Sequence, residues 1–266
     1  MIALTACVDG IGLLGPGLND WSAGCAVLTG ELSYGPRPSV LPAPDSLPPA
    51  ERRRTGRIVK LALAVGLEAT SRAAVHPSHL PTVFSSSGAD GQNCDEICRT
   101  LASSDRQLSP TRFHNSVHNV AAGYWSIANG ARAPSNSLCA FDASFSAGLL
   151  EALTQIAIER TPCLLIAYDA PYPEPLFAKR PIPDAFGVAL LLSPKPRPAS
   201  LARISAALTD DPADRLAHPD LERLRAAIPA ARSLPLLQAV AQRKDRRVVL
   251  DYLDGLRLAV QSAPCL

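Results

Sequence analysis

The fold is decided by residues 111–153, which read TRFHNSVHNVAAGYWSIANGARAPSNSLCAFDASFSAGLLEAL. The pattern predicts a helix over 116–129, a Gly-Ala-Arg-Ala-Pro turn, a short apolar strand over 137–141 and a second helix over 143–159. A strand that ends in a tight turn at a helix N-terminus often mounts a nucleophile, because the free N–H groups and the helix dipole stabilise negative charge there. The residue at this turn is Asp142.

Length and composition indicate one sizeable core. The chain has 266 residues, 47% of them hydrophobic, and its 26 basic and 24 acidic residues are interspersed. Only 5% of the residues are aromatic, which argues against a nucleic-acid-binding protein built on stacked rings. We expect the dense basic runs at 52–54 and 243–247 to be solvated faces.

Seven scattered cysteines indicate a reducing compartment, because their number is odd and their spacing does not repeat. Cys94 and Cys98 lie one helical turn apart, but a zinc site needs four ligands and no second pair follows nearby, so we expect no metal and no other cofactor. The N-terminus lacks the basic region of a signal peptide, and no apolar run approaches the roughly 18 residues of a membrane span. We therefore expect a cytoplasmic protein.

The rest of the chain alternates between strands and helices. Strands that are apolar on both faces, alternating with amphipathic helices, predict an α/β protein with a central sheet covered by helices. A Lys-Pro-Arg-Pro run from 195 to 198 suggests a domain over 1–194 and a short α+β appendage over 195–266 that completes or caps the fold. We expect strands over 2–8, 80–86, 162–168, 185–192 and 201–208, helices over 21–28, 51–74, 93–102, 219–227 and 234–242, a hairpin over 248–260, and a glycine-rich turn over 9–17 that relieves a close backbone approach.

Several motifs follow one another in the order seen in the β-ketoacyl synthases of the thiolase fold. They are TACVDGIG (5–12), NVAAG (119–123), APS (133–135), the turn at Asp142 and AFGVALLL (185–192). Over residues 1–194 the chain therefore resembles this family. The segments HNSVHNVAAGYWSIANG (114–130) and AYDAPYPEPL (167–176) look more particularly like the short ketosynthase-like proteins of aryl polyene gene clusters, which are regarded as chain-length-factor-like partners of a true ketosynthase.

The resemblance implies a thiolase-like layered fold with a mixed central sheet and a truncated second half. A condensing enzyme of the family carries a cysteine at the turn, whereas aligning residues 140–144 with its Ala-Cys-Ala-Ser places Asp142 there. The family's two histidines are also missing, since only His218 follows residue 194, in a different setting. We therefore expect no condensation by this chain alone, but a chain-length-factor-type subunit that pairs with a catalytic β-ketoacyl-ACP synthase in aryl polyene or type II fatty-acid-like polyketide biosynthesis.

The resemblance also implies where the partner binds. In related ketosynthases the dimer seam is built by the elbow strand and its flanking segments, so we expect residues 111–145 to meet the catalytic subunit and to shape the acyl pocket. An acyl carrier protein with its acyl chain is a further candidate partner, whereas nucleic acid and an integral membrane segment are not expected. The expected interface or pocket residues are Phe113, His114, Asn115, His118, Asn119, Tyr124, Trp125, Ser137, Cys139, Phe141, Asp142, Ser144 and Phe145.

Some of these residues have structural roles as alternatives. We expect Asp142 to cap the following helix, with malonyl decarboxylation or priming as the chemical alternative. Cys139 is expected inside the strand, pointing into the packed sheet. His114 and His118 should share one helical face and hold no metal, because the glutamate of His-Glu-x-x-His is absent. For each aromatic residue, core packing is the alternative.

A serine hydrolase is the alternative from another class. Residues 144–148 (SFSAG) imitate the Gly-x-Ser-x-Gly elbow with its first glycine replaced, and Ser146, Asp169 and His218 follow in the chain order of a hydrolase triad. Against this, Asp142 already occupies the turn. Ser146 would then lie within the helix, with its hydroxyl bonded to a backbone carbonyl.

Overall fold

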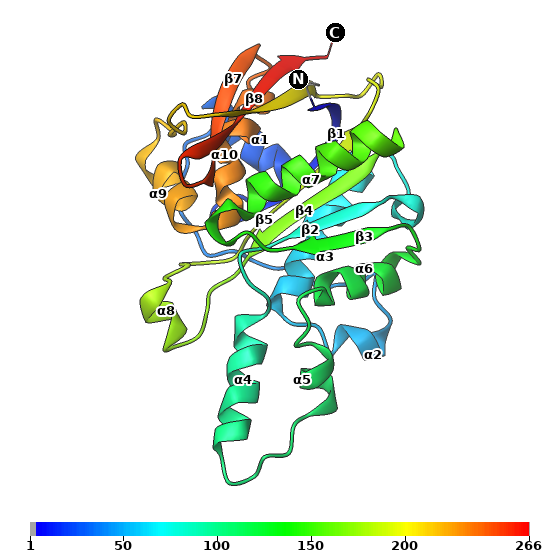
Figure 1. Cartoon of the computed structure of the whole chain (residues 1–266), viewed down its shortest axis with the longest axis vertical. Helices are drawn as coiled ribbons and strands as arrows, with labels where there is room; N and C mark the ends of the chain where they lie inside the picture. The colour runs from blue at the N-terminus through cyan, green and yellow to red at the C-terminus, as the bar shows by residue number, and fades with distance from the viewer. Residues whose placement is uncertain (1–3, 266) are drawn as a thin grey trace.

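A mixed eight-stranded sheet forms the centre of the computed structural model, which describes residues 4–265 (Figure 1). The strands lie in the order β3-β2-β4-β5-β1-β6-β8-β7. β3, β2 and β4 run parallel, and the other neighbouring pairs are antiparallel. The strands are β1 (Leu4–Leu14), β2 (Thr82–Ser85), β3 (Ser135–Leu138), β4 (Cys163–Asp169), β5 (Phe186–Ser193), β6 (Ala202–Thr209), β7 (Arg246–Leu253) and β8 (Leu256–Pro264).

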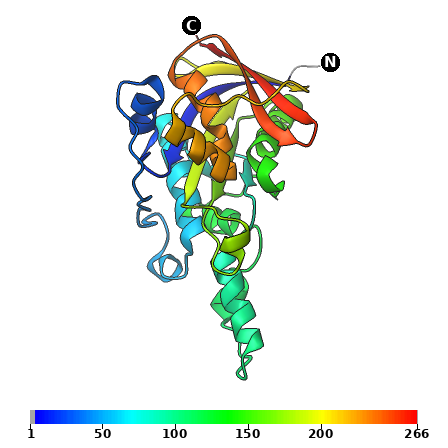
Figure 2. The ribbon, with the colours of Figure 1, turned by 90° about the vertical axis from the view of Figure 1, so that its left-hand side faces the viewer.

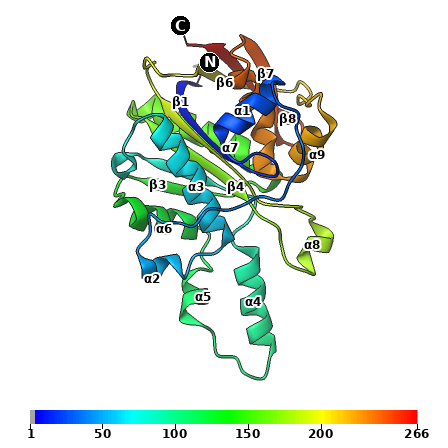
Figure 3. The same ribbon diagram turned by 180° about the vertical axis from the view of Figure 1, so that it is seen from behind.

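Helices cover both faces of this sheet, which confirms the predicted α/β architecture. On one face, α7 packs with α1, α9 and α10 around a core that includes Phe145 and Leu149 (Figure 1). On the other face, α3 and α6 bury Leu61 and Trp125 (Figure 3). The helices are α1 (Trp21–Thr29), α2 (Pro49–Arg52), α3 (Arg57–Arg72), α4 (Gly91–Ala102), α5 (Pro110–His114), α6 (Val120–Asn129), α7 (Ser144–Glu159), α8 (Leu176–Lys179), α9 (Pro219–Ala227) and α10 (Leu234–Ala241), with 3-10 turns η1 (Pro77–His79), η2 (Phe141–Ala143) and η3 (Pro229–Ser233).

The first strand includes most of the glycine-rich segment over 9–17 that we expected to be a turn. β1 continues to Leu14, so the prediction of a turn from residue 9 is wrong. The glycines do allow a close backbone approach, because a Cβ on Gly12 would overlap the carbonyl oxygen of Val65 in α3. The strand was expected from residue 2, and residues 2 and 3 lie outside the described residues.

Of two helices that the sequence predicts, one is broken and the other begins later than expected. The helix expected over 51–74 is divided at 53–56, where Gly56 lies so close to the Asp90 carboxylate that a Cβ would overlap it. The helix expected over 116–129 begins only at Val120. His114 therefore ends α5 and His118 lies in the following turn, so the prediction that they share one helical face is wrong.

Two further segments complete the architecture, one outside the central layers and one within the sheet. α4 and α5 form a hairpin that projects from the body of the molecule (Figure 2). After residue 194 the chain continues the sheet, because β6 pairs with β1, β8 with β6 and β7 with β8. η3 from this later part reaches β4 and α7, which brings it beside the turn between β3 and α7.

Candidate functional site

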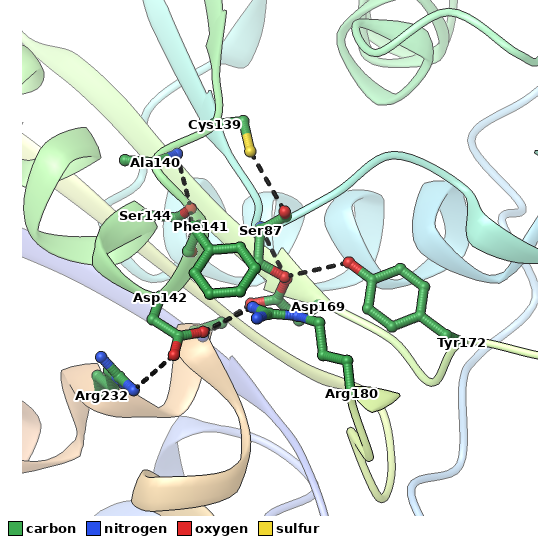
Figure 4. Close-up of polar contacts among 11 residues, drawn as sticks. Ser87, Cys139, Ala140, Phe141, Asp142, Ser144, Asp169, Tyr172, Arg180 and Arg232 are labelled. Carbon is green, nitrogen blue, oxygen red and sulfur yellow. Dashed lines mark hydrogen bonds and ion pairs between the residues drawn. The ribbon is translucent and has the colours of Figure 1, made fainter. Parts of the chain in front are cut away.

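The turn between β3 and α7 has its sharpest point at Phe141. This residue has a φ of +52°, in the left-handed region that costs a bulky side chain roughly 1–2 kcal/mol and that clusters at functional turns. Ser144 stabilises the turn, since its hydroxyl donates to the Phe141 carbonyl at 2.7 Å and accepts from the Ala140 N–H at 3.0 Å (Figure 4). Phe141, rather than Asp142, therefore occupies the strained position.

Asp142 is held by two arginines and does not cap the helix. α7 begins at Ser144, and its N-cap residue, Ala143, makes no side-chain capping bond. The two carboxylate oxygens of Asp142 instead accept from Arg180 Nη2 at 2.6 Å and from Arg232 Nη2 at 3.1 Å (Figure 4). The prediction of a helix cap is wrong because the 3-10 turn η2 separates Asp142 from the start of α7.

Arg180 also covers the tip of the turn. Its guanidinium carbon lies 3.7 Å from the centroid of the Phe141 ring, a cation–π arrangement. The side chains of Arg180 and Arg232 are only 16% and 20% exposed, so their charges interact with Asp142 in a partly desolvated setting. The one carboxylate at the turn is thus bound to two cations, and the strained residue is a phenylalanine with no nucleophilic atom.

Asp169 is buried beside the turn, at the end of β4. Its carboxylate accepts from the N–H and hydroxyl of Ser87, at 2.8 and 2.5 Å, and from the Ala230 N–H at 2.8 Å. Burial raises the pKa of Asp169 to about 6, against the opposing effects of these hydrogen bonds and of Arg180. Asp169 thereby joins the end of β2 to η3.

Cys139 is not packed inside the sheet. β3 ends at Leu138, and Cys139 follows it as an exposed residue, so the prediction of a buried strand position is wrong. Its thiol donates to the Ser87 carbonyl at 3.2 Å (Figure 4). The nucleophilic form of cysteine is the thiolate, and the partner of this thiol is a carbonyl rather than a histidine base.

The structure does not assemble the hydrolase triad. Ser146 lies inside α7 and donates to the Asp251 carbonyl at 2.6 Å. Asp169 accepts from Ser87 and Ala230, and exposed His218 caps α9 by accepting the Asp220 N–H at 3.3 Å. The hydrolase alternative is therefore wrong, because each of the three residues is engaged elsewhere.

Several of the expected pocket residues belong to the cores. Tyr124 and Trp125 on α6 and Phe145 on α7 are each 1% exposed. Asn115 is also buried, where its side-chain amide donates to the Arg54 carbonyl at 2.7 Å and accepts from the Tyr124 hydroxyl at 3.2 Å. These side chains stabilise the scaffold beneath the predicted partner surface.

The remaining expected residues lie at or near the surface. Phe113 is 67% exposed and Phe141 62% exposed, which is unusual for large aromatic side chains. His114 and Asn119 are exposed, and Ser137 and His118 are half-buried. Among the described residues, the buried Nε2 of His118 has no hydrogen-bond partner.

Sequence reasoning missed the partners of Asp142. Arg180 directly follows α8 and Arg232 lies in η3, 38 and 90 positions away from Asp142 in the chain. Ser87, which binds Asp169, comes directly after the strand expected over 80–86, and the sequence assigned it no role. No local pattern marks these residues, since they meet the turn only when the sheet and η3 come together.

Two further candidate features find no support in the described part of the chain. Within residues 4–265, no group of three or more His, Cys, Asp or Glu side chains is arranged to hold a metal ion. None of the helices that the structure describes combines the length and the apolar character needed to cross a bilayer.

A comparison with protein families decides the identity of the scaffold. The sequence profile of the beta-ketoacyl synthase N-terminal domain matches residues 30–250. This chain belongs to that family. A search of curated proteins finds no match to this ketosynthase-family chain.

Solved structures similar to this ketosynthase-family chain share its fold at low sequence identity. One is the ketosynthase ApeO in complex with its chain length factor ApeC from Xenorhabdus doucetiae, with 23% identity, a TM-score of 0.72, and 97% of this chain and 99% of that chain covered. The ishigamide ketosynthase/chain length factor has 14% identity, a TM-score of 0.72 and coverage of 98% and 100%. A type II polyketide synthase complex of ketosynthase and acyl-carrier protein has 12% identity, a TM-score of 0.73 and coverage of 99% and 100%. The expected thiolase-like layered fold is thereby confirmed.

Removal of the Asp142 carboxylate should destabilise the fold. In Asp142→Ala the two partly buried arginines would lack their shared counter-ion, so we expect the free energy of unfolding to fall by about 1–2 kcal/mol in urea titrations. Asp210→Ala is the matched control, since Asp210 is exposed, and it should change stability by less than about 0.5 kcal/mol. Equal effects of the two substitutions would contradict the structural role of Asp142.

Proposed function

We propose that this chain is the non-condensing, chain-length-factor-type subunit of a heterodimeric β-ketoacyl-ACP synthase. One observation carries the proposal: the turn that would present the nucleophile on this scaffold holds Phe141 and an Asp142 bound to Arg180 and Arg232. A thioester acyl chain needs a thiol at this position, and neither side chain supplies one. The catalytic cysteine then belongs to a partner subunit.

The similar structures support this assembly. Two of them carry the words chain length factor beside ketosynthase in their names, and a third contains a ketosynthase with an acyl-carrier protein. The resemblance of residues 114–130 and 167–176 to the aryl polyene proteins favours a polyene chain as the product. An acyl carrier protein would deliver that chain to the partner.

The exposed edge of β3 is the surface that we propose for the partner. The carbonyls of Pro134 and Leu138 accept from the N–H groups of Thr82 and Ser86. Every second residue of this segment, counted from Pro134, therefore directs its backbone polar groups towards β2. The backbone groups of Ser135 and Ser137 therefore point away from the sheet, as alternate residues of an edge strand do. Pairing with a strand of the catalytic subunit would satisfy them and remove an open edge.

Malonyl decarboxylation by Asp142 receives no support from this geometry. A carboxylate that acts on malonyl needs an oxygen free to approach it, and both Asp142 oxygens accept from arginines. We assign to this chain a structural role, in which it closes the acyl pocket at the dimer interface. The partner carries out acyl transfer and condensation.

Phe113 is the side chain for which we expect the clearest effect on product length. It is 67% exposed on α5, within the range 111–145 that we expect to meet the catalytic subunit, and its ring can limit the depth of a shared pocket. In a reconstituted complex, Phe113→Ala should lengthen the main product by at least about one two-carbon unit, as measured by mass spectrometry. Val40→Ala is the control, since Val40 is 77% exposed but lies outside this surface. An unchanged product from Phe113→Ala would exclude Phe113 from the pocket.

The assembly itself is tested by co-expression with a candidate catalytic ketosynthase. We expect a stable one-to-one complex in size-exclusion chromatography with light scattering. Recovery of a homodimer of this chain that ignores the ketosynthase and elongates acyl carriers by itself would refute the proposed function.

A further inference from the structure

A cavity of about 460 Å³ lies between the segment that joins α1 to α2, the residues before β5, and α9. Its volume falls within the range of roughly 300–1,000 Å³ that is typical of small-molecule sites. The Tyr34 ring and the Leu224 side chain, 8% and 6% exposed, lie in its wall. Prolines and an alanine supply most of the remaining wall: Pro16, Pro36, Pro38, Pro183 and Ala227. The cavity therefore offers a mainly apolar surface to a ligand.

The segment that forms one wall of the cavity is irregular but firmly anchored. Residues 30–48 contain neither helix nor strand, and they run past α9 (Figure 3). Loops of this length are uncommon in compact domains and are usually either functional or disordered. Here the Tyr34 hydroxyl donates to the Pro16 carbonyl at 2.8 Å, and the Ser39 hydroxyl donates to the Ala185 carbonyl at 2.7 Å. The wall is thus fixed before a ligand binds, which lowers the entropic cost of binding.

One charge at the rim of the cavity is not neutralised. In the described part of the chain, the exposed guanidinium of Arg37 makes no hydrogen bond or ion pair. The two carboxylates of the same rim are both engaged. Asp184 binds Arg57 at 2.8 Å, outside the cavity lining. Asp220 forms an ion pair with Arg223. The rim therefore carries an excess of one positive charge, which favours a ligand with a single negative charge.

The apolar wall and the single unpaired guanidinium together define the class of ligand. A guanidinium binds a carboxylate through two parallel hydrogen bonds, a geometry that a lysine ammonium does not offer. We propose that this cavity binds an amphiphilic monocarboxylate. Its alkyl or aromatic body packs on Tyr34 and Leu224, and its carboxylate pairs with Arg37. The proposal does not rest on the proposed function, since β4 and β2 separate the neighbouring β5 from the open edge of β3.

The proposal is tested by isothermal titration calorimetry of the full chain with octanoate. We expect one site with a Kd below about 1 mM. Octylammonium, which has the same alkyl body and the opposite charge, should bind at least about 10-fold more weakly. Arg37→Gln should weaken octanoate binding at least about 10-fold and remove the preference for octanoate over octylammonium. Arg53→Gln is the matched control, because Arg53 is another exposed and unpaired arginine of the described chain that lies outside this cavity, and it should bind octanoate as the wild type does.

A second pair of variants blocks the cavity without changing its charge. Ala227 is exposed at the end of α9 and lines the cavity, so Ala227→Trp should abolish octanoate binding. Ala226→Trp places the same ring on the neighbouring exposed position outside the cavity lining, and binding should persist. Circular dichroism melting of each variant verifies that the fold is retained.

Four outcomes would overturn the proposal. They are no binding by the wild type at about 10 mM octanoate, octylammonium binding as tight as octanoate binding, an unchanged Kd in Arg37→Gln, and octanoate binding that survives in Ala227→Trp. None of these outcomes bears on the pairing of this chain with a catalytic ketosynthase, so the two proposals can fail separately.

Discussion

Ser137→Pro should abolish the complex with the catalytic subunit while leaving the isolated chain folded. Pro134 and Leu138 bond to Thr82 and Ser86 of the β2 segment, so the backbone N–H of Ser137, which alternates with them, points away from β2. A proline at this position therefore removes no hydrogen bond of the sheet. It does remove a donor from the outer edge, and its ring obstructs an approaching strand. We expect no complex by size-exclusion chromatography, and a change in unfolding free energy below about 1 kcal/mol.

Two variants of the same strand serve as controls. Ser137→Ala removes the side chain but keeps the N–H, so the complex should persist. Asn136→Pro removes an N–H that points towards β2, and it should destabilise the isolated chain by about 3 kcal/mol. A complex that forms normally with Ser137→Pro would exclude β3 pairing as the mode of association.

Asp169→Asn should destabilise the isolated chain most strongly at acid pH. An amide placed between Ser87 and Ala230 must point its NH₂ group at one of two backbone donors, so we expect the variant to be less stable than the wild type at every pH. The pKa of Asp169 is raised to about 6 in the folded state, so the folded chain binds this proton more tightly than the unfolded chain does. The wild type therefore loses stability as the pH rises from about 4 to about 7, and the asparagine variant lacks this loss.

The measurement is the difference in unfolding free energy between wild type and variant, from urea titrations at several pH values. Other carboxyl groups titrate equally in both proteins and cancel in the difference. A shift of about two pKa units corresponds to roughly 3 kcal/mol, so the difference should narrow by up to that amount towards pH 8. A difference that widens with rising pH would show that the pKa of Asp169 is lowered by folding.

Most of the scaffold follows from local patterns in the sequence. The apolar runs that became β4 and β5 and the periodic helices α7 and α9 lie within one or two residues of their predicted bounds. The two strands are continuously apolar and the two helices are apolar on the face that the fold buries, so local patterns alone locate them. The hairpin of β7 and β8 was marked by its Asp-Gly turn.

The failures share a physical cause, which is contact between distant segments. β1 passes through its glycines because α3 lies against it, a fact that no local pattern in residues 9–12 contains. Asp142 faces Arg180 and Arg232 instead of its own helix because η3 and the loop before β5 meet there. The absence of a nucleophile at the turn between β3 and α7 could be predicted, because the sequence shows no cysteine at that position. The contacts of Asp142 with Arg180 and Arg232 could not be predicted.

The central claim is that the partner, and not this chain, carries the acyl group. Its most direct test incubates the purified heterodimer with acyl-loaded carrier protein in the absence of malonyl units and records the intact mass of each subunit. We expect one acyl adduct on the catalytic subunit and none on this chain, including at Cys139. An acyl adduct on this chain, in the complex or alone, would contradict the account.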